Sequence, residues 1–423
     1  MKNYHYDVVV VGGGPAGLAA ALSARREGQG KVAIIERDFR LGGILEQCIH
    51  TGFGLKYFGE ELAGPQYAYQ FIKEVEKEDI DIFLNTMVLE IDKSQKQIYA
   101  VNSVDGPCSF YAKAIVLSMG CRERTRAAIA LPGSRPAGVY TAGTAQRFAN
   151  IQNYLVGKKV VILGSGDIGM IMARRMTLEG AKVEAVVEIM PYLAGLTRNR
   201  VQCLDDYGIP LYLEHTITEI RGNKRVEGIT VAKVDHNKQP LMETAFDIGC
   251  DTLLLSVGLI PENEVSKTAD VELSPVTKGP VVDHMMQTSI PGIFACGNVV
   301  HVNDLVVNVS MESEIAGKFA ALYAKGNVAD SEVISSVPGE NVRYLAPQKI
   351  SSGNVRGNVK LYFRVLAPEK DVTVIARLNE EEVYRKKKKF VNPGEIESVE
   401  IKEEFLKKCE AGQITVEVRK GEC

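Results

Sequence analysis

The sequence predicts an α/β protein in which two separate units carry parallel sheets and a small β-rich region ends the chain. Residues 7–36 and 159–188 share one pattern: an apolar strand, a glycine-rich turn, a helix, a second apolar strand and a closing glutamate. Their strands are unbroken apolar runs, which is typical of parallel strands covered by helices on both faces. Beyond about residue 335 the chain changes to short β-type segments separated by Pro, Gly and Asn turns.

Length and composition restrict the class of protein. A chain of 423 residues is long enough for two or three domains, and 45% hydrophobic with 24% charged residues is a globular balance. The net charge of −3 provides no basic excess for a nucleic-acid partner. No apolar run approaches the roughly 18–20 residues of a membrane span. The glycines within residues 8–24 argue against a signal peptide, so we expect a cytoplasmic protein without a transmembrane segment.

The cysteines are scattered without a metal-binding or redox spacing. No two of them form a CxxC or CxxxxC pair, so the sequence predicts neither a zinc site nor a local redox dithiol. Scattered cysteines in a long chain are typical of a reducing cytoplasm, where most of them pack as small apolar residues. The eight positions are Cys48, Cys108, Cys121, Cys203, Cys250, Cys296, Cys409 and Cys423.

The two glycine-rich turns agree in register. The separation from Gly12 to Glu36 is 24 positions (36 − 12), and that from Gly164 to Glu188 is also 24 (188 − 164). Two matches in register are much stronger evidence than a single GxGxxG motif. Both segments therefore have the pattern of a dinucleotide-binding βαβ unit.

In the first unit each glycine has its own task. Gly12 permits the tight turn, Gly14 lets the backbone approach a diphosphate, and Gly17 allows close packing of helix on strand. The diphosphate binds the exposed N–H groups and positive end of the helix, so no basic side chain is needed. Glu36 is placed to accept hydrogen bonds from both hydroxyls of an adenosine ribose. The alternative, a plain βαβ turn that binds nothing, accounts less well for the whole fingerprint.

The second unit repeats these tasks at Gly164, Gly166 and Gly169. Glu188 bonds a free ribose 2′-hydroxyl and repels a 2′-phosphate, so the sequence favours NAD(H) over NADP(H). Arg198 and Arg200 follow downstream, and their capacity to accept a phosphate leaves the alternative open.

Later segments supply the closing elements of both sheets. The runs AIVLSMG, ending at Gly120, and DTLLLSVGLIP, closing near Pro261, read as buried strands. A further strand-like segment, GIFACGN, spans residues 292–298, and a helical pattern follows over 313–326. Two interleaved α/β domains would use these elements.

The chain resembles the pyridine nucleotide–disulfide reductase family of flavoproteins with two dinucleotide folds, nearest its thioredoxin-reductase-like branch. The resemblance covers about residues 5–328 and rests on both fingerprints and on the glycines of the later motifs. These further motif positions are Gly42, Gly43, Gly120, Gly258, Pro261 and the Gly297-Asn298 pair.

The resemblance implies FAD at the first fingerprint and NAD(P)H at the second. The expected fold is α/β, with two Rossmann-like dinucleotide-binding domains and a small C-terminal antiparallel β domain. The FAD domain would span 1–124 and 256–330, the inserted NAD(H) domain 125–255, and the β domain 338–423. The expected FAD-binding residues are Gly12, Gly14, Pro15, Ala16, Gly17, Glu36, Arg37, Gly42, Gly43, Val88, Gly120, Gly297 and Asn298. The expected NAD-binding residues are Gly164, Gly166, Asp167, Ile168, Gly169, Glu188 and Gly258.

Two departures from the family pattern bear on activity. The flavin-ribityl motif usually ends in Gly-Asp, whereas here Asn298 keeps a hydrogen-bonding group and removes the charge. In thioredoxin reductases a CxxC occupies the stretch that matches GVYTAGTA, where this chain has Ala142 and Ala145. A disulfide cannot be exchanged without sulfur, so thioredoxin reduction by that route is not expected.

Cys48 is the one candidate catalytic side chain. It lies five residues past Gly43, about where the family places the chain beside the flavin. His50 is a neighbour that would lower a thiol pKa if it were in contact, but residues two apart do not share a helix face. A flavin-proximal redox role and a packing role therefore stay open, and packing is favoured. Cys121 and Cys296, each beside a flavin-site glycine, read as small residues fitted beneath the cofactor.

The segment CIHTGFGLKYFGEELAGPQY also resembles flavin subunits found with FAD-dependent glycerol-3-phosphate dehydrogenases. Relatives occur in multisubunit sarcosine, opine and proline dehydrogenases. This resemblance implies a second flavoprotein subunit as partner, with a small cysteine-rich or iron–sulfur protein. Assembly into a homo-oligomer is left open.

The expected function is an FAD-dependent NAD(H) oxidoreductase that exchanges electrons with a protein partner or a small acceptor. One alternative is direct oxidation of an amine or imino acid at the flavin. Another is a non-enzymatic module that senses redox state through FAD and NAD. The basic run Arg385–Lys389 reads as a solvated edge strand, with a docking patch for an acidic partner as the alternative.

Overall fold

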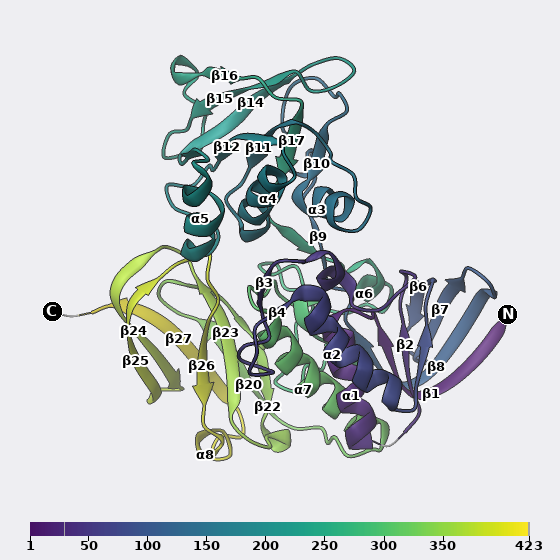
Figure 1. Cartoon of the computed structure of the whole chain (residues 1–423). Coiled ribbons are helices and arrows are strands. Elements are labelled where there is room, and N and C mark those ends of the chain that lie inside the picture. Colours follow the sequence, from purple (N-terminus) through teal and green to yellow (C-terminus); the bar gives the residue numbers. More distant parts are fainter. Residues whose placement is uncertain (29, 422–423) are drawn as a thin grey trace. The chain divides into compact units, whose positions relative to one another are not determined.

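The computed structural model describes residues 1–28 and 30–421 and divides into two compact units (Figure 1). The first unit comprises Met1–Cys121 and Pro261–Cys423, and the second is the inserted segment Arg122–Ile260. Each unit contains a parallel sheet with helices packed on it, so the predicted α/β class with two Rossmann-like sheets is confirmed. Among the described residues, no helix has the length and apolar character needed to cross a membrane.

The first unit is built on a sheet ordered β5-β2-β1-β8-β7-β6, with β19 added beside β8. Strands β5, β2, β1, β8 and β19 pair in parallel, while β6 and β7 form an antiparallel extension. Strands β2 and β19 and the carboxyl-terminal ends of β1 and β8 are buried apolar runs, as the sequence predicted, whereas the edge strand β5 is largely exposed. The strands are β1 (Lys2–Val11), β2 (Val32–Ile35), β5 (Ile80–Phe83), β6 (Thr86–Asp92), β7 (Gln97–Asn102), β8 (Gly106–Leu117) and β19 (Ile293–Ala295).

Helices α1 (Pro15–Gly28) and α7 (Val306–Ala324) pack on this sheet, and α2 (Gly64–Lys77) packs on α1. Helices α1 and α7 run side by side (Figure 1). A Cβ on Gly317 would lie 2.0 Å from the carbonyl oxygen of Ala20, so the contact depends on that glycine. The sequence predicted a helix over 313–326, whereas α7 already starts at Val306, so the predicted start was too late. Packing against α1 overrides the low helix propensity of its opening valines.

Short elements complete the first unit outside its C-terminal β region. They are the 3₁₀ helices η1 (Gly43–Gln47) and η5 (Gly297–Val299), the strands β3 (Thr51–Phe53) and β4 (Leu62–Ala63), and the α-helix α6 (Glu264–Thr268). Strands β3 and β4 pair as an antiparallel hairpin just before α2.

The second unit has a five-stranded parallel sheet ordered β10-β17-β11-β12-β13. An antiparallel sheet, β14-β15-β16, is attached to it, and the chain enters and leaves through the paired strands β9 and β18. The parallel strands are β10 (Val139–Thr141), β11 (Lys159–Leu163), β12 (Lys182–Val187), β13 (Leu211–Tyr212) and β17 (Thr252–Leu255). The other strands are β9 (Cys121–Glu123), β14 (His215–Arg221), β15 (Gly228–Lys233), β16 (Phe246–Ile248) and β18 (Leu259–Pro261). The α-helices are α3 (Ala142–Asn150), α4 (Asp167–Leu178) and α5 (Thr197–Cys203), and the short 3₁₀ helices are η2 (Ala127–Ile129), η3 (Asp205–Tyr207) and η4 (Met242–Thr244).

The C-terminal β region has a hydrophobic core of its own and belongs to the first unit. Its two sheets are ordered β22-β20-β27-β24-β25 and β21-β23-β26. Pairing is antiparallel as predicted, except that β20 and β27 are parallel. The segments between these two strands supply the long crossover that a parallel pair requires. The elements are β20 (Val333–Pro338), β21 (Val342–Ala346), β22 (Lys349–Ser351), η6 (Ser352–Asn354), β23 (Val359–Val365), β24 (Glu369–Leu378), β25 (Glu381–Val391), β26 (Glu397–Ile401), α8 (Glu403–Leu406) and β27 (Gly412–Lys420).

The basic run lies on β25, the last strand of its sheet order. This agrees with the interpretation of an edge strand whose charges discourage further pairing. Arg385 pairs with Glu382 at 2.6 Å, and Lys388 pairs with Glu397.

Candidate functional site

The first glycine-rich turn follows β1 and is too crowded for any other residue type at two positions. Gly12 has a φ of +107°, and a Cβ there would lie 2.6 Å from the carbonyl oxygen of Ser118. A Cβ on Gly17 would lie 1.7 Å from the carbonyl oxygen of Gly12. Both glycines are therefore required for the turn to form and for α1 to pack on it.

Gly14 has different surroundings. The nearest atom to a Cβ on Gly14 is the Cα of Gly43 at 3.8 Å, so the chain itself leaves room at this position. Pro15 begins α1, and the first turn of the helix contains no acidic residue. An open space beside a helix amino end is the environment that a diphosphate requires.

The carboxylate of Glu36 is held beside this turn. Its Oε2 accepts a hydrogen bond from the N–H of Gly13 at 2.6 Å, and its Oε1 accepts one from Asp38 at 2.7 Å. The side chain is buried, whereas the neighbouring Arg37 is exposed. Backbone donors thus fix the carboxylate at the carboxyl end of β2, where an adenosine ribose is expected.

The loop after β2 folds back onto the turn. The N–H of Gly42 donates to the carbonyl oxygen of Gly13 at 2.9 Å, and a Cβ on Gly43 would lie 2.8 Å from the Cα of Gly14. The start of β6 also meets this region, because the N–H of Thr86 donates to the carbonyl oxygen of Glu36 at 2.9 Å. Val88, two residues further along β6, is part of the hydrophobic core.

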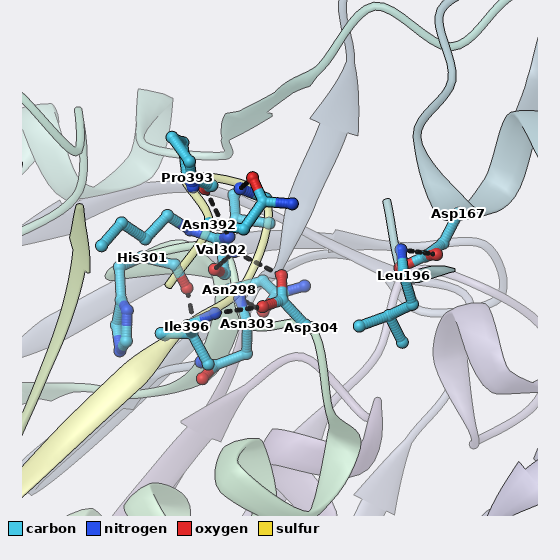
Figure 2. Close-up of polar contacts among 12 residues, drawn as sticks. Asp167, Leu196, Asn298, His301, Val302, Asn303, Asp304, Asn392, Pro393 and Ile396 are labelled. Carbon is cyan, nitrogen blue, oxygen red and sulfur yellow. Dashed lines mark hydrogen bonds and ion pairs between the residues drawn. The ribbon is translucent and has the colours of Figure 1, made fainter. Parts of the chain in front are cut away.

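The remaining motif residues of this unit gather near the start of α1. Gly297 has a φ of +71°, and a Cβ there would lie 2.9 Å from the Cβ of Ala16. The Nδ2 of Asn298 lies 3.7 Å from the Sγ of Cys121, the residue that follows Gly120. The Oδ1 of Asn298 accepts a hydrogen bond from the N–H of Asn303 at 2.9 Å (Figure 2).

Cys296 is fully buried, and burial raises the pKa of its thiol to about 12. That agrees with a small residue packed next to the motif rather than a reactive thiol.

These residues share one edge of the sheet. The turn at Gly12, Glu36, Gly120 and Gly297 come just after the carboxyl ends of β1, β2, β8 and β19, which are all parallel. In open parallel sheets, ligands bind outside this edge. The glycine turn, the start of α1 without an acidic residue and the oriented carboxylate fit the diphosphate and ribose of an FAD.

The second unit reproduces the first cradle. Gly164 has a φ of +99°, and a Cβ there would lie 2.1 Å from the carbonyl oxygen of Ser256. A Cβ on Gly169 would lie 2.7 Å from the carbonyl oxygen of Gly164, whereas Gly166 has no atom closer than 3.2 Å. The crowding at the first and third glycines and the relative openness at the second match the first unit.

Glu188 is held by three donors. Its Oε2 accepts hydrogen bonds from the N–H and the hydroxyl of Ser165 at 2.8 and 2.7 Å, and its Oε1 accepts one from Met190 at 2.9 Å. The side chain is buried. Its carboxylate therefore occupies the same place in this cradle as Glu36 does in the first.

The loop after Glu188 is attached to the cradle. The hydroxyl of Ser165 accepts a hydrogen bond from the N–H of Ala194 at 3.0 Å. The Oδ1 of Asp167, in the first turn of α4, accepts one from Leu196 at 2.8 Å (Figure 2) and one from the Nδ2 of Asn199 at 2.6 Å. The side chain of Asp167 thus positions this loop, a role that the sequence did not indicate.

The other predicted residues of this unit lie around the same turn. Ile168 follows Asp167 in α4 and packs against the core of the unit. Gly258 has a φ of +101°, and its carbonyl oxygen accepts a hydrogen bond from the N–H of Arg124 at 2.9 Å. Arg198 is exposed, and Arg200 lies 3.6 Å from Asp205.

Two serines belong to the cradles and were not singled out from the sequence. The hydroxyl of Ser118 donates to the carbonyl oxygen of Val11 at 2.8 Å, and that of Ser256 accepts from the N–H of Gly169 at 3.1 Å. Each serine follows the strand that lies next to the glycine-turn strand. A signal was present, since LSMG and LSVG place a serine two residues before Gly120 and Gly258.

Cys48 is buried below the amino end of α2. Its Sγ lies 3.3 Å from the carbonyl oxygen of Ile44, and its own carbonyl oxygen accepts a hydrogen bond from Gly64 at 2.8 Å. Burial raises the pKa of the thiol to about 12, the opposite of what a reactive cysteine needs. The ring of His50 packs 5.1 Å from that of Phe53. These contacts favour the packing alternative for Cys48.

Replacing Cys48 with serine is therefore expected to leave the rate of flavin reduction by NADH unchanged. Because the thiol stays protonated up to a pH near its raised pKa, iodoacetamide at about pH 8 is expected to alkylate Cys48 slowly. Mass spectrometry of timed samples measures this labelling. Rapid alkylation together with loss of reduction in Cys48→Ser would instead support a redox role.

No disulfide joins the cysteines of the described chain, and no cluster of metal-ligating side chains occurs among its residues. At the position of the thioredoxin-reductase dithiol, Ala142 and Ala145 are buried in α3. The N–H of Gly143 donates to both carboxylate oxygens of Glu123, at 2.8 and 2.9 Å. The amino end of α3 is thus occupied by a carboxylate instead of a redox-active sulfur pair.

Comparison with known proteins identifies the class that this fold and these cradles define. The family model described as pyridine nucleotide-disulphide oxidoreductase matches residues 6–314. The chain therefore belongs to the pyridine nucleotide-disulphide oxidoreductase family, as the sequence motifs predicted. It is a flavin-dependent enzyme of the NAD(P)H-using kind. The C-terminal β region lies beyond the matched residues.

Relatives of known activity agree with this class. The NAD(P)H coenzyme A polysulfide/persulfide reductase of Pyrococcus horikoshii is 25% identical over 78% of this chain and 72% of its own. The rubredoxin-NAD(+) reductase of Ectopseudomonas oleovorans is 29% identical over 69% of this chain and 71% of its own.

Solved structures show the same fold. The thioredoxin reductase of T. acidophilum has a TM-score of 0.62 at 25% identity, and the alignment covers 77% of this chain and 99% of that chain. The L-proline dehydrogenase of P. horikoshii has a TM-score of 0.53 at 21% identity, covering 78% of this chain and 57% of that chain.

Proposed function

We propose that the cradle formed by Gly12, Gly14, Gly17 and Glu36 binds FAD and that the cradle formed around Gly164 and Glu188 binds NADH. The observation that carries the proposal is the duplication of a complete cradle, including the crowded glycines, the backbone-anchored carboxylate and the serine beside them. Bound together, the two cofactors supply hydride transfer between the nicotinamide and the flavin ring.

The residues of the chain bind and orient in this reaction. The amino ends of α1 and α4 present N–H groups to the diphosphates, and the two glutamates fix the adenosine riboses. Asn298 contributes the second hydrogen of its Nδ2 group for the ribityl chain, since its Oδ1 already accepts a hydrogen bond from Asn303 and its Nδ2 directs one hydrogen at the Sγ of Cys121. Hydride transfer needs no side chain as a proton donor, so the catalytic role of the protein is positioning.

A preference for NADH over NADPH is the finer part of the proposal. The buried carboxylate of Glu188 would repel a 2′-phosphate, and the residues from Ile189 to Thr197 contain no basic side chain that would bind one. Arg200 already has Asp205 as a neighbour, and Arg198 lies on the exposed side of α5.

Replacing Glu188 with alanine is expected to narrow the NADH over NADPH preference by on the order of 1–2 kcal/mol, because charge-assisted bonds to the ribose are lost. The measurement is kcat/KM for flavin reduction with each nucleotide. Glu184→Ala, on the same strand β12, removes a carboxylate paired with Lys182 at 2.8 Å and is the matched control. Unchanged selectivity in Glu188→Ala would mean that this carboxylate does not contact the ribose.

We further propose that the electrons pass to or from a protein partner. The absence of a dithiol at Ala142 and Ala145 removes the internal disulfide route. The related rubredoxin-NAD(+) reductase reported above is named for rubredoxin as its partner, which supports a partner for this chain as well. The test is anaerobic mixing of FAD-loaded protein with NADH and with NADPH, followed by a screen of electron carriers, flavoprotein subunits and small acceptors. Turnover with an amine in the absence of nicotinamide would contradict the proposal.

A further inference from the structure

The C-terminal β region contacts the loop that follows the Gly297-Asn298 motif through an ion pair and hydrogen bonds. The guanidinium of Arg364, on β23, forms an ion pair with Asp304 and donates to the carbonyl oxygen of Val302 at 3.1 Å. The same guanidinium donates to the carbonyl oxygen of Pro393 at 3.2 Å. One side chain thus ties the loop to two segments of the β region.

The carboxylate of Asp304 is shared with the backbone. Its second oxygen, Oδ2, accepts a hydrogen bond from the N–H of Ile396 at 2.6 Å (Figure 2). The side chains of Arg364 and Asp304 are only 14% and 13% exposed, so water screens their attraction weakly. An ion pair in such surroundings, with two further hydrogen bonds to carbonyl oxygens, constrains geometry more than an exposed pair does.

A second set of contacts holds the same loop at His301. The Nε2 of His301 lies 2.8 Å from the Oε1 of Glu312 on α7, and both side chains are almost completely buried. The hydroxyl of Tyr344, on β21, lies 3.5 Å from the Nδ1 of His301. The ring of Tyr362, on β23, lies 5.7 Å from that of His301.

The same loop is hydrogen-bonded to Asn298, a residue of the predicted flavin site. Asn303, between the two residues that Arg364 contacts, donates its N–H to the Oδ1 of Asn298. Helix α7 begins at Val306, so its amino end is fixed by the same loop. A shift of Val302 or Asp304 would therefore move both Asn298 and the start of α7.

We propose that the C-terminal β region is a clamp that positions the flavin-binding loop, with Arg364 as its positioning residue. The proposal rests on FAD binding at the first cradle, as proposed above. The clamp selects which group of Asn298 faces the flavin, because the loop occupies Oδ1, whereas Nδ2 carries two hydrogens and directs only one of them at the Sγ of Cys121. We do not expect Arg364 to contact the cofactor itself, because it acts on the flavin site through Asp304 and Asn303.

The test compares Arg364→Gln with Arg377→Gln. Arg377, on β24, is also a partly buried arginine paired with a carboxylate, but its partners Glu417 and Glu382 both belong to the β region and not to the loop. In Arg364→Gln we expect the FAD dissociation constant to rise by about tenfold, which corresponds to roughly 1.4 kcal/mol. We also expect a changed visible absorption spectrum and midpoint potential of the bound flavin. Arg377→Gln is expected to match the wild type in all three, and Arg364→Lys to restore part of the affinity.

Two results would contradict the proposed clamp role of the β region. One is an Arg364→Gln protein with wild-type circular dichroism whose FAD affinity, spectrum and potential are unchanged. The other is an equal loss in Arg377→Gln, which would indicate general destabilisation of the β region. If Arg364→Gln does not fold, Asp304→Asn carries the same test, since it removes the charge with little change of shape. A wild-type chain that takes no FAD would overturn the proposed function and the clamp with it, whereas wild-type binding with unaffected variants would overturn the clamp alone.

Discussion

Replacing Gly14 with alanine is expected to leave the chain folded but to weaken FAD binding by on the order of 10- to 100-fold. The protein has room for the added methyl group, because the nearest atom to its Cβ is 3.8 Å away. In the proposed complex with FAD the diphosphate occupies that space. The added methyl group would therefore force the phosphates away from the amino end of α1. Equilibrium titration of apoprotein with FAD, followed by flavin fluorescence, measures the loss.

Gly17→Ala provides the contrasting variant. A Cβ there would lie 1.7 Å from the carbonyl oxygen of Gly12, so the substitution cannot be accommodated without moving backbone. We expect it to lower the free energy of unfolding of the apoprotein, whereas Gly14→Ala should not. Wild-type FAD affinity in Gly14→Ala would show that the open space beside α1 is not the diphosphate site.

A substitution in the second cradle is expected to separate FAD binding from reduction. In Gly164→Ala the Cβ would lie 2.1 Å from the carbonyl oxygen of Ser256, at a φ of +99° that also disfavours a side chain. Because the inserted unit has its own core, we expect this variant to retain FAD and to lose reduction by NADH by about 100-fold or more. The measurement is anaerobic rapid mixing of the flavin-loaded variant with NADH.

Gly180→Ala is the matched control for this variant. Gly180 lies in the same unit and also has a positive φ, of +86°, but no atom lies within 4 Å of its Cβ. It therefore carries the same type of backbone strain without the collision. Equal loss of reduction in both variants would attribute the effect to strain in the unit rather than to the nucleotide cradle.

The local part of the cradles was predictable from sequence. The glycine spacing and the two glutamates follow from short-range geometry, in which a strand, a turn and a helix dictate residue types at fixed offsets. The parallel sheets were predictable for a similar reason, since strands buried on both faces are apolar throughout. Ser118 and Ser256 were visible as repeated letters, but their contacts depend on which strands become neighbours.

The long-range part was not predictable from one sequence. Arg364 and Asp304 are far apart along the chain, and nothing in the composition of β23 indicates that a loop of the nucleotide-binding part will lie against it. The late start predicted for α7 has the same origin, because contact with α1 stabilises residues of low helix propensity. The raised pKa of Cys48 likewise depends on burial, which its neighbours in sequence do not determine.

The most direct test of two dinucleotide cradles is a measurement of binding stoichiometry and competition on one sample. Protein saturated with FAD is dialysed, titrated anaerobically with NADH, and examined for bound flavin, bound nucleotide and flavin absorbance. We expect one FAD per chain, which NADH reduces without displacing it. A chain that never retains flavin, or one from which NADH expels FAD by competing for a single site, would contradict it.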